Sequence, residues 1–341
     1  MALVARGDEV LSHVAIGWAE VAPEPRPMRQ DTIFDLASLT KPVAGATAAL
    51  LLLEDGVWRL DDRVVDFIPD FGQHGKHEIT LRHLLTHASG LAAWAPMYVH
   101  AREPEASLAF LCSLQPEAEP GTRVEYSDLG FSLIGHLVRR VTGESLDVLL
   151  ERRAWSVLNM RDTHYCPPAS LKRRIAATER GNQFEQTMVA DRGLAFSGWR
   201  DYLQVGEVND GNAHYALGGI SSHAGLFSTA EDLLRFALMY VRGEGAVLSR
   251  ASIDQAVRNH TPQFDQARGL GWQLQPARVF GDLLSETAYG HTGFTGTSLV
   301  VDPARELIVI LLTNRTHPEA SNDSIGLIRP RFHNLVAASL G

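Results

Sequence analysis

Cysteine is almost absent from this sequence, and long apolar runs are missing altogether. Cys112 and Cys166 are the only cysteines in 341 residues, which is too few for a disulfide framework, and their spacing is not that of a metal site. We expect both to be buried free thiols. No stretch reaches the roughly 20 consecutive apolar residues of a membrane-spanning helix. The sequence therefore predicts a globular chain with no membrane span.

Positive charge is also in short supply. Lysine and arginine together number 31, against 40 aspartates and glutamates, and the formal net charge is −9. This balance argues against nucleic acid or an anionic membrane as a partner. The first ten residues lack the charged and apolar regions of a signal peptide. As written, the chain is expected in the cytoplasm, whereas a segment missing before Met1 would allow a periplasmic or secreted protein.

Two common hydrolase motifs do not occur. No G-x-S-x-G nucleophile elbow is present, which argues against an α/β-hydrolase. His77-Glu78 is not followed by a histidine three residues later, because His83 is six positions from His77, and the zinc-protease pattern is therefore absent. The remaining histidines are scattered. We expect no metal and no cofactor.

The feature around which the chain is organised is Ser38-Leu39-Thr40-Lys41-Pro42. The chain has only three lysines and 21 serines, so chance predicts about 0.2 serine–lysine pairs at this spacing. Residues i and i+3 share one face of a helix, and a serine hydroxyl needs such a base to become a nucleophile. Pro42 fits only near a helix start, where free NH groups lie. The sequence predicts a nucleophile and its base here, the alternative being a helix-capping Ser38 and a solvated Lys41.

The pattern of elements predicts an α/β (α+β) fold. Strands near both ends of the chain suggest one central antiparallel sheet flanked by helices, formed by residues 1–58 and 216–341, into which a mostly helical domain of residues 59–215 is inserted. The expected strands are 2–5, 10–17, 217–220, 289–294, 297–301 and 307–313, and the expected helices begin at Ser38 and span 81–91, 129–141, 145–158, 229–242 and 322–340.

Two further motifs complete a constellation. Tyr126-Ser127-Asp128 begins a predicted helix, and His291-Thr292-Gly293 lies on a predicted strand. The order S-x-x-K, then Tyr/Ser-x-Asn/Asp, then K-T-G or a relative resembles the penicillin-recognising serine hydrolases. With Tyr126 leading the second motif, the chain is similar to the branch that holds class C β-lactamases, serine D-Ala-D-Ala carboxypeptidases, D-aminopeptidases and β-lactamase-like esterases. Residues 84–91 and 218–227 are most similar to the penicillin-binding protein 4B type.

The resemblance implies a β-lactamase/transpeptidase-like fold and a role for each motif. Ser38 would be the acylated nucleophile, Lys41 its proton partner, and Tyr126 the phenolic base and acid. The positive charge of Lys41 is expected to lower the pKa of Tyr126. The backbone NH groups of Ser38 and Phe294 would form the oxyanion hole. The resemblance places Asp128 and the residues His291, Thr292 and Gly293 on the substrate-binding side of the site.

This chain departs from the family pattern at two positions. Asp128 replaces the more usual asparagine, and it could instead be the N-cap of the following helix. His291 replaces lysine and is mostly uncharged at neutral pH, so the cavity is expected to lose a fixed cation for a substrate carboxylate. This favours an esterase.

The predicted function is thus a serine hydrolase that cleaves a small ester or amide through a Ser38 acyl-enzyme. The alternatives are a D-Ala-D-Ala carboxypeptidase or D-aminopeptidase acting on a peptide, a class C β-lactamase, and a non-catalytic binding protein of the same fold.

Overall fold

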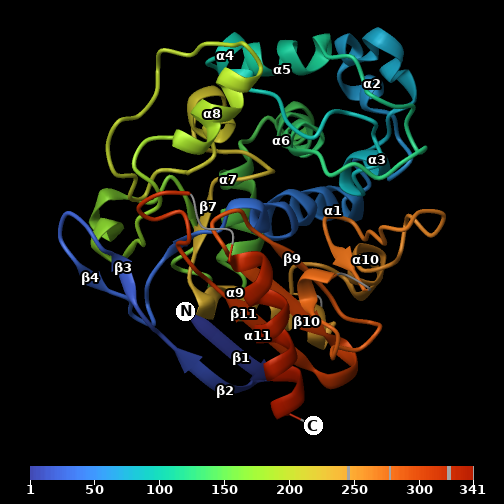
Figure 1. Ribbon diagram of the computed structural model, residues 1–341. Coiled ribbons are helices and arrows are strands. Elements are labelled where there is room, and N and C mark those ends of the chain that lie inside the picture. The colour runs from blue at the N-terminus through green and yellow to red at the C-terminus, as the bar shows by residue number, and fades with distance from the viewer. Residues whose placement is uncertain (244–245, 276–277, 321–323, 341) are drawn as a thin grey trace.

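The structure, a computed structural model, describes residues 1–243, 246–275, 278–320 and 324–340. It has a sheet half, where both termini lie, and a helical half above it (Figure 1). Helix α1 (Thr47–Glu54) is buried between the two halves and leads back to the nucleophile segment. The site is therefore anchored in the middle of the molecule.

The central sheet is antiparallel throughout and has the strand order β2-β1-β11-β10-β9-β8. Its first hairpin turns at Gly7 and Asp8, and its last three sequential strands form a meander, as the sequence predicted. The strands are β1 (Ala2–Arg6), β2 (Glu9–Val14), β8 (Gln273–Leu274), β9 (Tyr289–Thr292), β10 (Ser298–Asp302) and β11 (Leu307–Leu311).

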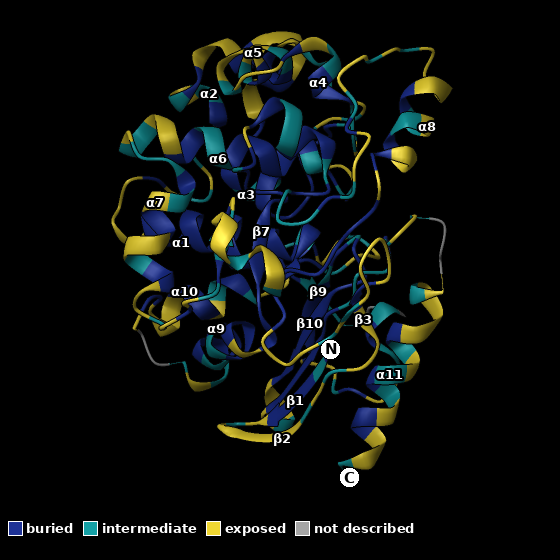
Figure 2. Ribbon diagram, turned by 90° about the vertical axis from the view of Figure 1, so that its left-hand side faces the viewer, coloured by how far each residue is buried: buried dark blue, intermediate teal, exposed yellow. Residues whose placement is uncertain are grey.

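Both faces of the inner strands of this sheet are buried, whereas the edge strand β2 is mostly exposed. Leu3 is in register with Ile310, and both point into the main core with helix α9 (Ala230–Arg242). The next pair, Val4 and Val309, points into a second core beneath helix α11 (Ile325–Ser339). Side chains alternate between faces along a strand, so one run of apolar residues serves both layers. Figure 2 shows β1, β9 and β10 mostly dark blue between partly exposed helices, and the edge strand β2 mostly yellow.

Helices make up much of the rest of the described chain, and the helices predicted over 129–141 and 229–242 are confirmed. Helix α6 (Asp128–Thr142) ends at Gly143, whose φ of 74° suits glycine. Helix α9 is capped by Thr229, whose side chain accepts from the NH of Asp232. The other helices are α2 (Val64–Phe67), α3 (Leu81–Leu85), α4 (Met97–His100), α5 (Pro104–Ser113), α7 (Leu146–Leu150), α8 (Gln183–Asp191) and α10 (Arg250–Ala256).

Three predicted elements differ from the structure. The helix expected over 81–91 ends at Leu85, because His87 adopts a left-handed φ of 60°. Residues 217–220 are not a strand, since Gly218 and Gly219 both have positive φ. The strand here is β7 (Leu226–Ser228), which lies between β5 (Phe34–Asp35) and β6 (His164–Tyr165). The helix expected over 145–158 begins as α7 and continues as a π-helical turn over Glu151–Trp155.

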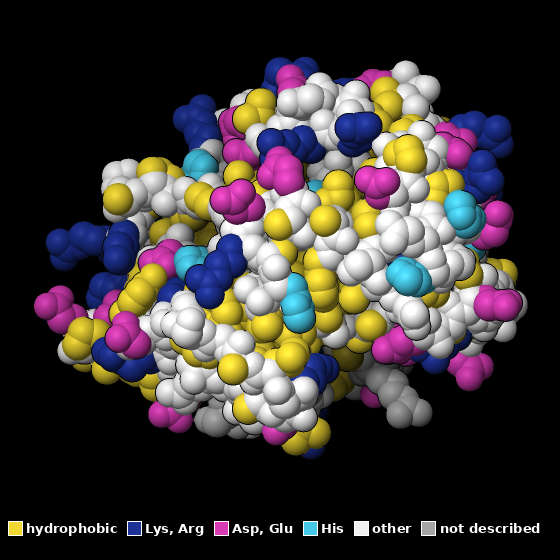
Figure 3. Space-filling view, turned by 90° about the horizontal axis from the view of Figure 1, so that it is seen from above, with side chains coloured by type: hydrophobic (Ala, Val, Ile, Leu, Met, Phe, Trp, Pro, Cys, Tyr) yellow, Lys and Arg dark blue, Asp and Glu magenta, His cyan; other side chains and the backbone are white. Residues whose placement is uncertain are grey.

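Other expectations concern the surface and the termini. Cys112 is buried, but Cys166 is exposed, so the prediction of two buried thiols is wrong for Cys166. Residues 322 and 323 of the predicted last helix lie outside the described residues. In the described ranges, no helix is both long and apolar enough to cross a bilayer. Seen from above, acidic and basic side chains are interspersed over the helical half (Figure 3). The domain boundaries at residues 58/59 and 215/216 stay a prediction.

Candidate active site

The nucleophile segment is built from three consecutive helical geometries. Ser38 lies in a 3-10 turn (Ala37–Leu39), which is followed by a π-helical segment (Lys41–Ala46) and then by α1. Ala37 has a φ of 47°, a conformation that costs a non-glycine residue energy and tends to mark functional sites. The NH of Ala37 donates to Asp35 Oδ1 at 2.8 Å. Ser38 therefore lies in a strained turn, which the hydrogen bond between Ala37 and Asp35 stabilises.

Lys41 is completely buried beside Ser38. Its Nζ lies 3.0 Å from Ser38 Oγ, 2.6 Å from Asp128 Oδ1 and 3.1 Å from the carbonyl oxygen of His223. An ammonium group has three protons, and each has an acceptor here. Burial lowers the pKa of Lys41, but Asp128, and after it Tyr126, more than offset burial, so the pKa lies above its usual value. The alternative of a solvated Lys41 is wrong.

Tyr126 lies against both groups. Lys41 Nζ is 4.7 Å from the centre of its ring, and its hydroxyl interacts with Ser38 and Lys41. Burial raises the pKa of Tyr126, and the opposing effect of Lys41 does not overcome it. The expectation that Lys41 lowers this pKa is therefore wrong in its net direction. The phenol is neutral in the resting site and has a proton to give.

His87 holds the Tyr126 segment in place. The sequence analysis did not predict a residue for this role. Its Nδ1 accepts from the NH of Ser127 at 3.0 Å, and its carbonyl accepts from the NH of Glu125 at 2.8 Å. The ring centres of His87 and Tyr126 lie 4.5 Å apart. Burial holds the pKa of His87 well below its usual value. The signal in the sequence was the family-like stretch 84–91, in which a histidine precedes Ala-Ser-Gly.

Asp128 is the first residue of α6 but not its cap. Ser127 is the N-cap, because its Oγ accepts from the NH of Gly130 at 3.0 Å. The carboxylate of Asp128 is left to pair with Lys41. The N-cap alternative for Asp128 is therefore wrong.

Strand β9 is clamped against the nucleophile turn through Gly293. A Cβ on Gly293 would lie 2.4 Å from the carbonyl oxygen of Leu36 and 2.2 Å from Thr297 Oγ1, so only glycine allows this approach. Thr297 Oγ1 donates to Leu36 O at 3.0 Å, and Thr295 Oγ1 donates to Asp35 O at 2.7 Å. These contacts bring Phe294 beside Ser38, where its NH was predicted to complete the oxyanion hole.

His291 is buried at the end of β9. Its Nδ1 lies 2.8 Å from the carbonyl oxygen of Thr292, and because a carbonyl only accepts, Nδ1 carries the proton. Burial, followed by the charges of Lys41 and Arg268, lowers the pKa of His291 well below its usual value. His291 is thus neutral, as predicted.

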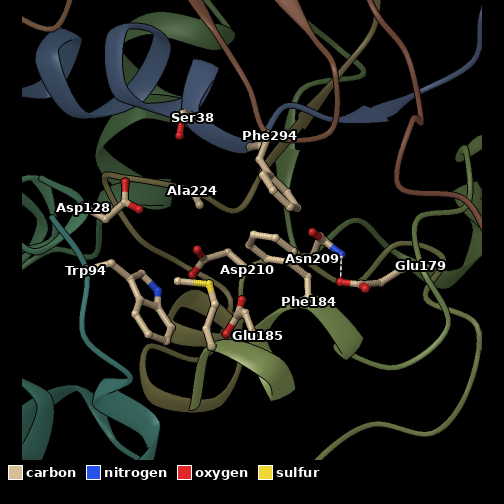
Figure 4. Close-up of a pocket in the computed structure, with 12 residues that line it drawn as sticks. Ser38, Trp94, Asp128, Glu179, Phe184, Glu185, Asn209, Asp210, Ala224 and Phe294 are labelled. Atoms are coloured by element: carbon tan, nitrogen blue, oxygen red, sulfur yellow. Dashed lines mark hydrogen bonds between the residues drawn. The ribbon is translucent and has the colours of Figure 1, made fainter. Parts of the chain in front are cut away.

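The cleft extends from Ser38 in two directions, and Ser38, Asp128 and Phe294 line both parts. We call the first part, of about 180 Å³, the carboxylate lobe; Figure 4 shows its acidic and aromatic side chains around the space below Ser38. The second part, of about 440 Å³, we call the guanidinium lobe. The carboxylate lobe includes Trp94, Glu179, Phe184, Glu185, Met188 and Asp210, and the guanidinium lobe includes Tyr126, Arg268, His291, Thr292, Gly293, Arg315 and Arg329.

The guanidinium lobe does not lack a fixed cation, contrary to the expectation from His291. Arg268 is only 6% exposed; its Nη2 donates to Gln266 Oε1 at 2.9 Å, and its Nη1 has no hydrogen-bond partner among the described residues. Arg329 donates to Thr297 O at 3.0 Å, and Arg315 to Phe294 O at 2.6 Å. Three arginines from other segments thus line the same lobe as His291, the position at which the family motif usually has a lysine.

Comparisons with known proteins agree with this geometry. The family model described as beta-lactamase matches residues 1–328. The N-acetylmuramyl-L-alanine amidase of Bacillus subtilis is 31% identical over 344 residues, which cover 92% of this chain and 76% of that protein. An Escherichia coli K12 protein, provisionally named a D-alanyl-D-alanine carboxypeptidase, is 31% identical over 84% of this chain and 70% of its own length. The octameric penicillin-binding protein homologue of Pyrococcus abyssi has the same fold, with a TM-score of 0.73, 21% identity, and coverage of 98% and 72% of the two chains.

Proposed function

The chain belongs to the beta-lactamase family, and from that premise we propose that it is a serine hydrolase in which Ser38 forms an acyl-enzyme with a small amide or ester. The observation that carries the proposal is the 3.0 Å contact between Lys41 Nζ and Ser38 Oγ, in a site that also holds Tyr126 and Asp128. A serine hydroxyl gains nucleophilic power from a base at this distance.

The resting ammonium of Lys41 must lose a proton before it can accept one from Ser38. Asp128 Oδ1, 2.6 Å away, is the acceptor. In acylation, the Ser38 Oγ–H bond breaks as Oγ bonds to the substrate carbonyl carbon. The Ser38 proton passes to Lys41 Nζ while Lys41 passes one to Asp128. The carbonyl π electrons move to oxygen, where the NH groups of Ser38 and Phe294 stabilise the negative charge.

Collapse of this intermediate expels the leaving group. The bond from the carbonyl carbon to the leaving atom breaks, and Tyr126, which is neutral, gives that atom its proton. Tyr126 is then reprotonated from Lys41, and Lys41 from Asp128, so the proton that left Ser38 is accounted for on the leaving group. Water repeats the sequence in reverse to release the acid and restore Ser38.

The leaving group occupies the guanidinium lobe, because Tyr126 lines that lobe and not the other. Arginine binds carboxylates with paired hydrogen bonds. We therefore propose an amide whose leaving group carries a carboxylate, which agrees with the names amidase and carboxypeptidase given to two relatives. The preference for esters stays a prediction. It was based on a cavity without a fixed cation, and arginines line the guanidinium lobe.

A fluorophosphonate probe tests the serine nucleophile, because it labels only an activated serine. Wild-type protein should be labelled at Ser38, shown by peptide mass, and Ser38→Ala should not. Substrate class is tested with N-acetyl-D-alanyl-D-alanine, its C-terminal amide, a p-nitrophenyl ester and nitrocefin. Failure of the wild type to label or to turn over any of them would support the non-catalytic alternative.

A further inference from the structure

One of the three acceptors that hold the Lys41 ammonium lies in a segment without regular secondary structure. This acceptor is the carbonyl oxygen of His223, 3.1 Å from Lys41 Nζ. Residues 217–225, which lead from a π-helical turn (Asn212–Ala216) to β7, form turns and bends. Neither a helix nor a strand ladder therefore fixes this carbonyl. Buried backbone groups outside such elements depend on side-chain hydrogen bonds around them.

The imidazole of His223 is buried and is fixed on one side by Asp210. His223 is 1% exposed, and its Nε2 lies 3.0 Å from Asp210 Oδ1. Burial raises the pKa of Asp210, but His223, and after it the NH of Ala213, more than offset burial, so the pKa lies below its usual value. The carboxylate of Asp210 can then only accept, and Nε2 of His223 carries the proton that it donates.

The other ring nitrogen contacts two serine hydroxyls. His223 Nδ1 lies 2.6 Å from Ser221 Oγ and 2.9 Å from Ser132 Oγ. Ser132 is on the first turns of α6, and its Oγ donates to the carbonyl oxygen of Asp128 at 2.8 Å. The Asp128 carboxylate is a second acceptor of the Lys41 ammonium. His223 thus supplies one acceptor of Lys41 and contacts the helix that carries another.

Other hydrogen bonds hold the rest of the segment independently of the imidazole. Ser222 Oγ accepts from the NH of Gly135, in α6, at 2.8 Å. Tyr165 donates its hydroxyl to the carbonyl oxygen of Ser221 at 2.6 Å. These contacts end one residue before His223. Loss of the ring should therefore leave the segment in place and free only the peptide group that follows His223.

We propose that His223 is a positioning residue for Lys41: its imidazole, anchored at Asp210, keeps its own carbonyl oxygen in place to bind the ammonium. The acceptors of Lys41 together keep Nζ 3.0 Å from Ser38 Oγ, and a displacement of about 1 Å in a reacting group can cost about a hundredfold in rate. His223 lines neither lobe, so it acts through Lys41 and not on the substrate. This inference rests on the proposed function and assigns a further residue to it.

Two measurements test this role. The first is the rate of fluorophosphonate labelling of Ser38 at pH 7. The second is the titration of Lys41, followed by NMR of protein with carbon-13 at Cε of lysine. The chain has only three lysines, and loss of a signal in Lys41→Met identifies that of Lys41.

Both measurements are made in wild type, His223→Ala, His223→Gln and His333→Ala. His333 is fully buried and its Nε2 lies 3.4 Å from Ser298 Oγ, but it lines neither lobe. His333→Ala therefore controls for the loss of a buried imidazole that contacts a serine. The amide of glutamine can still donate to Asp210, so His223→Gln tests the anchor.

His223→Ala should slow labelling by about tenfold or more. It should also move the Lys41 titration to lower pH by about half a unit, because the ammonium loses an acceptor while Asp128 remains. His223→Gln should slow labelling by about threefold or less, and His333→Ala should change neither measurement.

An unmoved titration or an unchanged labelling rate in His223→Ala would overturn the inference. So would equal losses in His333→Ala, or a loss in His223→Gln as large as that in His223→Ala. If His223→Ala does not fold, judged by circular dichroism, His223→Asn, whose shorter side chain does not reach Asp210, takes its place with the same two criteria. Absence of labelling in wild type would instead contradict the proposed function, and the titration would still test His223.

Discussion

Lys41 Nζ and Asp128 Oδ1 lie 2.6 Å apart, although the two residues are separated by 87 positions in the chain. The lysine is fully buried and the aspartate side chain is 22% exposed. This ion pair keeps Lys41 protonated in the resting site and gives its proton a destination. Several expected outcomes depend on it or on the charges around it.

Asp128→Asn should move the acidic limb of the pH profile of kcat/KM to lower pH by about one unit or more. Without the anion, only Tyr126 still opposes the effect of burial, so the pKa of Lys41 falls and the neutral amine forms at lower pH. Because the wild-type pKa of Lys41 lies above its usual value, the wild-type rate should still be rising at pH 10, whereas the rate of the variant should level off below it. The profile is measured with a p-nitrophenyl ester between pH 5 and 10. An unmoved limb would show that the ionisation of Lys41 does not govern the rate.

Ser38→Ala should abolish turnover while the protein stays folded, because only one small polar atom is removed. We expect kcat/KM for activated esters to fall by about a thousandfold or more. Steady-state kinetics and probe labelling measure the effect, with circular dichroism as the control for folding. A variant that keeps a tenth of the wild-type rate would contradict the role of Ser38.

Lys41→Arg should not restore function although it keeps the positive charge. Arginine cannot release a proton in a protein and so cannot take the one from Ser38. We expect a loss of about a hundredfold or more in kcat/KM, with the labelling rate of Ser38 reduced in parallel. Near-normal rates in a folded variant would show that Lys41 has only an electrostatic role.

Arg268→Gln should weaken the preference for substrates with a carboxylate in the leaving group. A unit charge 4 Å from a carboxylate contributes about 4 kcal/mol at an effective dielectric of 20, and solvent in the cleft reduces this to the order of a tenfold effect. The ratio of kcat/KM for N-acetyl-D-alanyl-D-alanine to that for its C-terminal amide measures it. Arg258→Gln, at an exposed position outside the lobe, is the matched control, and equal ratios in the two variants would refute the assignment.

Stability should fall as pH drops from 6.5 toward 4. Burial lowers the pKa of His136 and His333 to about 4, and that of His87 and His291 well below its usual value. These histidines are neutral when folded and charged when unfolded, so unfolding takes up protons in this range and acid favours the unfolded state.

Four buried carboxyl groups, those of Asp35, Glu179, Glu185 and Asp232, act in the opposite direction, because burial raises the pKa of each. The pKa of Asp35 is raised to about 6 and that of Glu185 to about 8, mainly by burial. The folded state favours their protonation, so these groups stabilise the folded protein more as the pH falls. Burial also lowers the pKa of His214 to about 4, so the histidines outnumber the carboxyl groups and unfolding still takes up protons near pH 5. Each such proton contributes about 1.4 kcal/mol per pH unit. The midpoint of urea unfolding, followed by tryptophan fluorescence at pH 7 and pH 5, measures the loss of stability. His136→Gln should make the fall in midpoint between the two pH values smaller. A midpoint at pH 5 equal to or higher than that at pH 7 would contradict the predicted net uptake of protons.

Local sequence patterns determined a large part of this protein. The hairpin of β1 and β2, the C-terminal meander and helices α6 and α9 were predicted because turn residues, alternation and caps act over a few residues. The same is true of the Ser38–Lys41 spacing. The helix expected over 81–91 failed because His87 leaves the helical conformation to support Ser127, a contact over 40 positions.

The charge state of the site was decided only by the tertiary structure. The pKa values of Lys41 and Tyr126 follow from burial and from Asp128, and neither effect is visible in a motif. The sequence suggested a cavity without a cation because it showed His291 in place of lysine. The fold instead brings Arg268 and Arg329 to that place from other segments and gathers Glu179 and Asp210 on the other side of Ser38. The order of residues in the chain indicates which groups carry out the chemistry. Electrostatic interactions act through space, so the packing of distant segments determines which charges surround those groups.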